Sequence, residues 1–130
     1  MAPASRALAV GRRRLDRGAA TAELVMVLPV LVAVTVGLVW LLSVGMAQLR
    51  TVDAARETAR ALARGDDRQA AIRRGREVAP SGARITVRVG IDEVAAVATA
   101  RVAGPGGLFG FLGAVTVRAE AVAAQEVSWP

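Results

Sequence analysis

The sequence predicts an α+β fold, in which a long N-terminal transmembrane helix continues into a small soluble domain with a second short helix and a three-stranded antiparallel sheet. Residues 24–49 carry no charged side chain. Residues 49–62 then repeat apolar side chains at steps of three and four, which is typical of a helix. Beyond residue 83, apolar and polar residues alternate in three short runs, which is typical of strands.

The apolar run is long enough to cross a membrane. Its 26 residues measure about 39 Å as a helix, whereas a bilayer core of about 30 Å needs roughly 20 residues. Pro29 removes one backbone donor and should kink the helix mildly. A secretory signal peptide is the competing interpretation, but its apolar core has only about 7–15 residues.

The helical pattern should continue beyond the membrane. No Pro or Gly occurs in residues 46–64, so we expect one helix over about residues 20–63. A second helix should follow, capped by Asp66 and ending near Val78, because Asp is a favoured N-cap. Turn residues at 80–82 should end it.

The three alternating runs should pair as an antiparallel meander on the outer half of the long helix. They cover residues 84–89, 94–102 and 114–124, with a hairpin connection near residues 91–93. The apolar cluster of residues 108–112 should cover the edge of the sheet or helix, or else contact the membrane surface or a partner.

The composition argues against an enzyme. The chain has no Cys and no His, which removes metal-thiolate sites and the usual general base. The paired carboxylates Asp66-Asp67 and Asp92-Glu93 fall in expected turns, where solvated loop residues are the simplest explanation. The Gly104–Gly107 stretch lacks the Lys-Ser/Thr of a phosphate loop. We expect no catalytic residue, cofactor, metal or small-molecule substrate.

The basic charge lies mostly before the apolar run. The net charge is +6, but residues 1–18 alone hold five Arg and one Asp, a net of +4. This distribution argues against nucleic acid as a partner. Under the positive-inside rule it places the N-terminus in the cytoplasm. We therefore predict a single-pass protein of the cell membrane, with a basic leader (1–18), a transmembrane helix (19–49) and an extracytoplasmic α+β domain (50–130).

Small residues recur within the apolar run at Ala33, Gly37 and Gly45, at steps of four and eight. Small side chains let helices approach closely in lipid. They are also common in membrane helices generally, so the spacing alone leaves specific helix packing open.

The start of the apolar run has an unusual carboxylate. Glu23 lies five residues after Gly18, and a carboxylate near bilayer depth is costly unless it is paired or close to the interface. One interpretation places Glu23 among the lipid headgroups, at the positive end of the helix. The other pairs it with a new amino terminus at Ala19, created by cleavage after Gly18. About one helical turn would separate the two charges.

This arrangement resembles the type IV prepilin signal: a basic leader, Gly18, Glu23 as the fifth mature residue, and a long apolar helix. More narrowly, residues 16–29 (DRGAATAELVMVLP) and 47–61 (AQLRTVDAARETARA) are similar to TadE-like minor pilins, strongly over residues 16–63. The Arg-only, Ala-rich composition is similar to actinobacterial members. The resemblance implies a pilin-like fold.

The resemblance also implies a function. The chain would be a minor pilin or pseudopilin of a tight-adherence secretion and pilus system, cut by a prepilin peptidase between Gly18 and Ala19. Glu23 would set the register of assembly in a surface fibre used for adhesion. Its partners would be other pilins, the assembly platform and the membrane. Two alternatives stay open: an uncleaved single-pass anchor with an extracytoplasmic binding domain, and a competence-type pseudopilin in DNA uptake.

Overall fold

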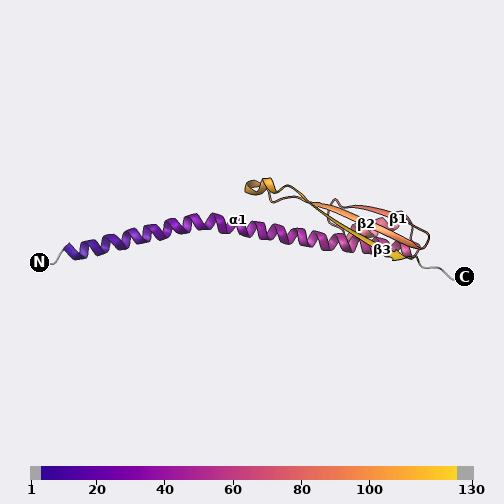
Figure 1. The fold of residues 1–130 in the computed structure, drawn as a ribbon, viewed down its shortest axis with the longest axis horizontal. Helices are drawn as coiled ribbons and strands as arrows, with labels where there is room; N and C mark the ends of the chain where they lie inside the picture. The colour runs from indigo at the N-terminus through magenta and orange to yellow at the C-terminus, as the bar shows by residue number, and fades with distance from the viewer. Residues whose placement is uncertain (1–3, 126–130) are drawn as a thin grey trace. The chain divides into compact units, whose positions relative to one another are not determined.

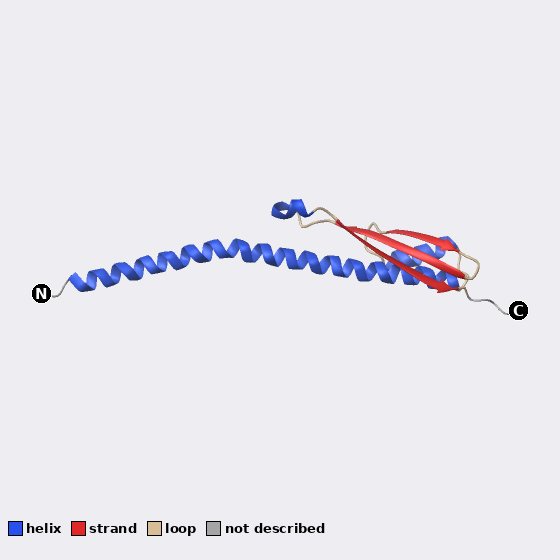
Figure 2. Cartoon of the chain, viewed as in Figure 1, coloured by secondary structure: helices blue, strands red, loops and turns tan. Residues whose placement is uncertain are grey.

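The chain forms two helices, a three-stranded sheet and one short 3-10 helix (Figures 1 and 2). The structure is a computed structural model that describes the backbone of residues 4–125 and the side chains of residues 21–107 and 109–125. In chain order the elements are α1 (Ala4–Ala63), α2 (Arg68–Val78), β1 (Arg84–Val89), β2 (Glu93–Val102), η1 (Gly107–Leu112) and β3 (Val115–Ala124). They divide into two compact units, Met1–Leu38 and Val39–Pro130.

Helix α1 ends at Ala63, as predicted, but begins at Ala4 and so includes most of the basic leader. Ala, Arg and Leu dominate that leader, and all three are strong helix formers. Hydroxyl groups inside the apolar run are satisfied by the helix itself. The Thr35 hydroxyl donates to the Leu31 carbonyl and the Ser43 hydroxyl to the Val39 carbonyl, both at 2.9 Å.

The sheet is the predicted antiparallel meander, in the order β1-β2-β3. Its register pairs Ile85 with Ala98, and Ala98 in turn with Ala119. On β2, the face that carries Val94, Ala96 and Ala98 is the inward one, because all three are fully buried. Val89 continues the inward alternation of β1 but is 57% exposed, since it lies at the end of the strand.

The sheet and α2 pack on the last third of α1 through small side chains. The core combines residues of α1 with residues of α2, β1 and β2: Ala54, Ala55, Ala59, Ala61, Leu62, Ala63, Ala71, Ile85, Val87, Val94, Ala96 and Ala98. Two buried hydroxyls on α1 are satisfied, because Thr51 donates to the Ala47 carbonyl and Thr58 to the Ala54 carbonyl. Alanine on α1 lets the sheet approach the helix backbone closely.

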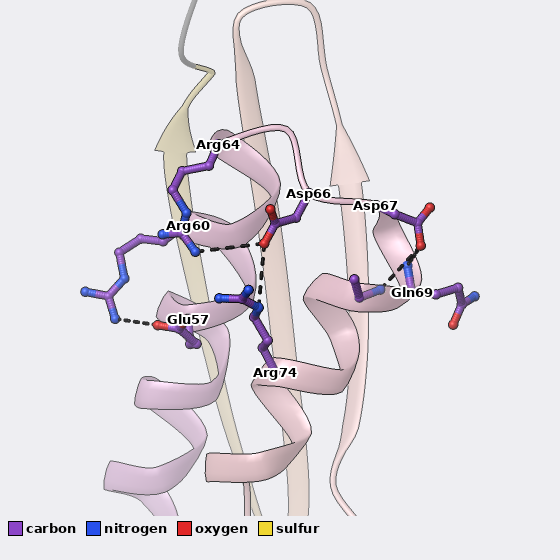
Figure 3. Close-up of polar contacts among 8 residues, drawn as sticks. Glu57, Arg60, Arg64, Asp66, Asp67, Gln69 and Arg74 are labelled. Carbon is purple, nitrogen blue, oxygen red and sulfur yellow. Dashed lines mark hydrogen bonds and ion pairs between the residues drawn. The ribbon is translucent and has the colours of Figure 1, made fainter.

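The predicted cap of α2 was wrong by one residue (Figure 3). Asp67 is the N-cap, and its carboxylate accepts from the backbone N–H groups of Gln69 and Ala70. Asp66 instead turns toward α1 and α2, where one carboxylate oxygen lies 3.9 Å from the Arg64 guanidinium and 3.6 Å from that of Arg74. Arg74 belongs to α2, so Asp66 joins the end of one helix to the middle of the next.

Gly75 marks the closest approach of α2 to its neighbours. A Cβ added there would overlap the Thr58 hydroxyl and lie 2.9 Å from the Ile85 side chain and 3.1 Å from the Ala54 carbonyl oxygen. The position therefore requires glycine for space. The helix ends near Val78, as predicted, and the Val78 side chain is 42% exposed.

The connection from β2 to β3 carries the apolar cluster of residues 108–112 on η1. The expectation that this cluster covers an edge of the fold is wrong for Phe111, which is 81% exposed. The Phe109 and Phe111 rings contact each other, with centroids 6.5 Å apart. Glycines with positive φ flank the turn at 106, 107 and 113, so its backbone follows a path that other residues rarely adopt.

Candidate functional site

The junction residues Gly18, Ala19 and Glu23 lie in the helical backbone of α1. Gly18 and Ala19 fall outside the residues whose side chains are described. The Glu23 side chain is described and exposed, and it lies four residues after Ala19, about one helical turn. An exposed carboxylate in this position can pair with a positively charged group, either the new terminus or a group of another molecule.

The apolar part of α1 has an exposed surface far larger than a soluble monomer normally carries. Within the described part of the chain, α1 is long and apolar enough to cross a membrane, by length and composition. Large side chains from Leu24 to Leu49 are exposed along it; Leu42, for example, is 68% exposed. The described residues leave the most apolar stretch of it uncovered, and an exposed surface of this kind is typical of membrane or protein contact.

The small residues Gly37 and Gly45 have space around them. A Cβ added at either position would meet nothing within 4 Å. Packing within this chain therefore does not require glycine there, in contrast to Gly75. Ala33, the third small residue of the predicted set, is half-buried on the same helix.

The end of the apolar run also belongs to the second compact unit. Ala47 forms a small core with Ala100 of β2 and Val117 of β3, and Val44 packs against it. The sheet thus lies on residues that the sequence predicted as transmembrane, and the compact unit begins at Val39. The domain boundaries at residues 18/19 and 49/50 stay predictions, because they concern cleavage and the membrane surface.

Two side chains in this region tie α1 to the sheet, and sequence reasoning missed both contacts. The Trp40 indole N–H donates to the Ala103 carbonyl at 2.9 Å. The Gln48 amide donates to the Arg118 carbonyl at 3.2 Å. Trp near the end of an apolar run is itself a signal, because Trp is enriched at membrane interfaces.

A shallow groove of about 370 Å³ lies where α1 meets the turn after α2. Its lining is mostly apolar, with Arg50 at one end: Val39, Leu42, Ser43, Met46, Ala47, Arg50, Pro80 and Ser81. The described side chains contain no group of three or more carboxylates that could hold a metal ion. The lining side chains give this groove the character of an apolar packing surface.

Residues 18–60 match the family model described as TadE-like protein. The chain carries a TadE-like segment. No curated protein and no solved structure matched the chain. The TadE-like segment begins at Gly18 and ends three residues before the end of α1, so it covers the junction, the apolar run and the part of α1 under the sheet.

The TadE-like match supports a pilus-related, pilin-like role, and the long apolar helix is of the length and composition that a membrane anchor requires. The family is structural, and its members are not known as enzymes. The resemblance drawn from the sequence is therefore confirmed at the level of the family, and the α+β fold is confirmed by the elements described above.

Proposed function

We propose that this chain is a minor pilin or pseudopilin of a tight-adherence, type IV-like pilus. A prepilin peptidase cuts between Gly18 and Ala19, and the mature subunit then packs through α1 against other pilins on the assembly platform. The N-terminus lies in the cytoplasm and the C-terminal domain outside. The observation that carries the proposal is the TadE-like match starting at Gly18, directly ahead of an apolar helix surface with no cover among the described residues.

Assembly through α1 explains three features together. Lateral contact between helices removes apolar surface from lipid or water. Small residues at Ala33, Gly37 and Gly45 let neighbouring helices approach closely, and the space around Gly37 and Gly45 is consistent with that role. Glu23 offsets the positive charge of a neighbour's terminus at Ala19, which fixes the axial register of the subunits.

Cleavage is tested by mass. The full chain is expressed with and without its native prepilin peptidase, and the mature N-terminus is determined from the intact mass. We expect a start at Ala19 with the peptidase and at Met1 without it, and Gly18→Leu should abolish the shift. A Met1 start in the presence of the peptidase would show an uncleaved anchor instead.

The role of Glu23 is tested separately from cleavage. Glu23→Ala should leave processing largely intact but reduce the amount of subunit in sheared surface fibres, because the terminus of the neighbour loses its counter-charge. Glu23→Asp, which keeps the charge, is the matched control and should retain more incorporation than Glu23→Ala. Equal incorporation of Glu23→Ala and the wild type would remove the registration role.

A further inference from the structure

The end of the sheet that carries η1 is uncharged over a long stretch. Residues 102–117 contain no Asp, Glu, Lys or Arg, and Thr116 is the one polar side chain among them. Arg101 and Arg118 flank this stretch on β2 and β3. The tip of the hairpin is therefore apolar up to a sharp boundary, and arginines form that boundary.

The apolar run of α1 ends at the same level. Its last residues are Gln48 and Leu49, followed by Arg50. Because the Gln48 side chain donates to the Arg118 backbone carbonyl, the change from apolar to charged residues on α1 lies beside the change on β3. Nearer the hairpin tip, Trp40 donates to the Ala103 carbonyl. The uncharged residues at the end of the apolar run of α1 and those of the β2–β3 hairpin thus lie side by side.

Among the described side chains, no acidic partner lies beside the arginines at the boundary. The strand register places Arg84, Thr99 and Arg118 in one row, and Arg101 lies two residues along β2 on the same face. Arg88 forms the ion pair with Glu120 at 2.9 Å, which leaves the other three guanidinium groups without a carboxylate within 4 Å among the described side chains. Arg84 and Arg101 line a hollow of about 550 Å³ together with Ser81, Thr99 and Thr116.

We propose that this end of the molecule is a second membrane contact: η1 lies in the headgroup–acyl boundary, and Arg84, Arg101 and Arg118 bind the phosphates of anionic lipids. Two features of this end of the molecule favour a lipid surface. Trp40, which bonds to the base of the hairpin tip, is of a type enriched at membrane interfaces, and the cations lie on the aqueous side of it, beside Gln48. An interfacial element of this kind combines a buried apolar face with basic residues above it. Its irregular backbone restricts it to the interface, since lipid-exposed loops do not occur in the hydrocarbon core.

The test uses the absence of cysteine from the chain. The full chain is reconstituted in phosphatidylglycerol-containing vesicles as a single-cysteine variant, Phe111→Cys, labelled with an environment-sensitive fluorophore. The matched control is Ile91→Cys, because Ile91 is 93% exposed and lies in the β1–β2 turn, at the opposite end of the sheet from η1 (Figure 1). Val34→Cys, in the apolar run, reports insertion of α1 itself.

We expect the label at 111 to be protected from aqueous iodide and quenched by doxyl lipids near the headgroups, while the label at 91 shows the reverse. Arg84→Gln with Arg101→Gln should reduce the protection at 111, whereas Arg88→Gln should not. Equal iodide quenching at 111 and 91, with Val34→Cys still protected, would overturn the proposal. Protection that disappears when protein is diluted in lipid would overturn it too, in favour of a second copy of the chain.

Discussion

Gly75 offers the sharpest test of how α2 packs on α1. Gly75→Ala adds one methyl group, and its Cβ would overlap the Thr58 hydroxyl and lie 3.1 Å from the Ala54 carbonyl oxygen. Thr58 cannot simply turn away, because its hydroxyl donates to that same carbonyl at 2.8 Å. Added methyl groups in a packed core cost about 1–3 kcal/mol, and the overlap with the Thr58 hydroxyl puts this one in the upper part of that range, at about 2–3 kcal/mol. The better helix propensity of Ala returns about 1 kcal/mol. The net loss of unfolding free energy should be about 1–2 kcal/mol.

The measurement is thermal unfolding of the full chain in detergent micelles, followed by the fluorescence of Trp40 in a Trp129→Phe background. A loss of about 1–2 kcal/mol should lower Tm by roughly 5–15 °C for a domain of this size. Gly45→Ala is the matched control, because the same methyl group there meets nothing within 4 Å. Its Tm should not fall.

A second substitution checks the cause. Thr58→Ala removes the hydroxyl that the new Cβ meets, so the double variant should lose less stability than the sum of the two single variants. If Gly75→Ala melted at or above the wild-type temperature, α2 could not lie this close to α1.

Three further predictions concern other contacts. Asp67→Ala should lower the unfolding free energy by about 1 kcal/mol in chemical denaturation because α2 loses its cap, and Asp67→Asn should not; equal loss in both would contradict the capping role. Trp40→Phe should cost about 1 kcal/mol through the lost bond to the Ala103 carbonyl, and an unchanged midpoint would argue against that bond. Gly45→Leu should leave the melting temperature of the subunit unreduced but lower its amount in sheared fibres; normal incorporation would separate Gly45 from assembly.

Much of the fold follows from the sequence because its patterns are local. The end of α1 at Ala63 is set by the glycine that follows shortly after, and the three strands by the alternation of apolar and polar residues. The N-cap of α2 could not be chosen between Asp66 and Asp67 from the neighbouring residues alone. Either residue suits an N-cap, and the choice depends on Arg74, which lies one helix further on and draws Asp66 away.

The candidate site also has some features that the sequence predicts and others that only the structure shows. The spacing from Gly18 to Glu23 and the length of the apolar run are visible in sequence. The contacts of Trp40 and Gln48 with the sheet are not, because each joins residues more than sixty positions apart. For the same reason, the shared level of the charge boundaries on α1 and on the hairpin appears only once the register of β3 against α1 is known.

The distribution of side-chain size around α1 bears directly on assembly. Toward the sheet it presents alanine and threonine, with Ala54, Ala55 and Thr58 fully or almost fully buried. Elsewhere on the helix, large side chains such as Leu42 and Leu49 stay exposed. The buried and the exposed side chains are different residues, so the exposed ones can exchange lipid for a neighbouring helix while the core against the sheet stays packed. In the proposed pilin role, a subunit therefore leaves the membrane without unfolding its domain. It loses the proposed lipid contacts of η1 and of the nearby arginines when it does so.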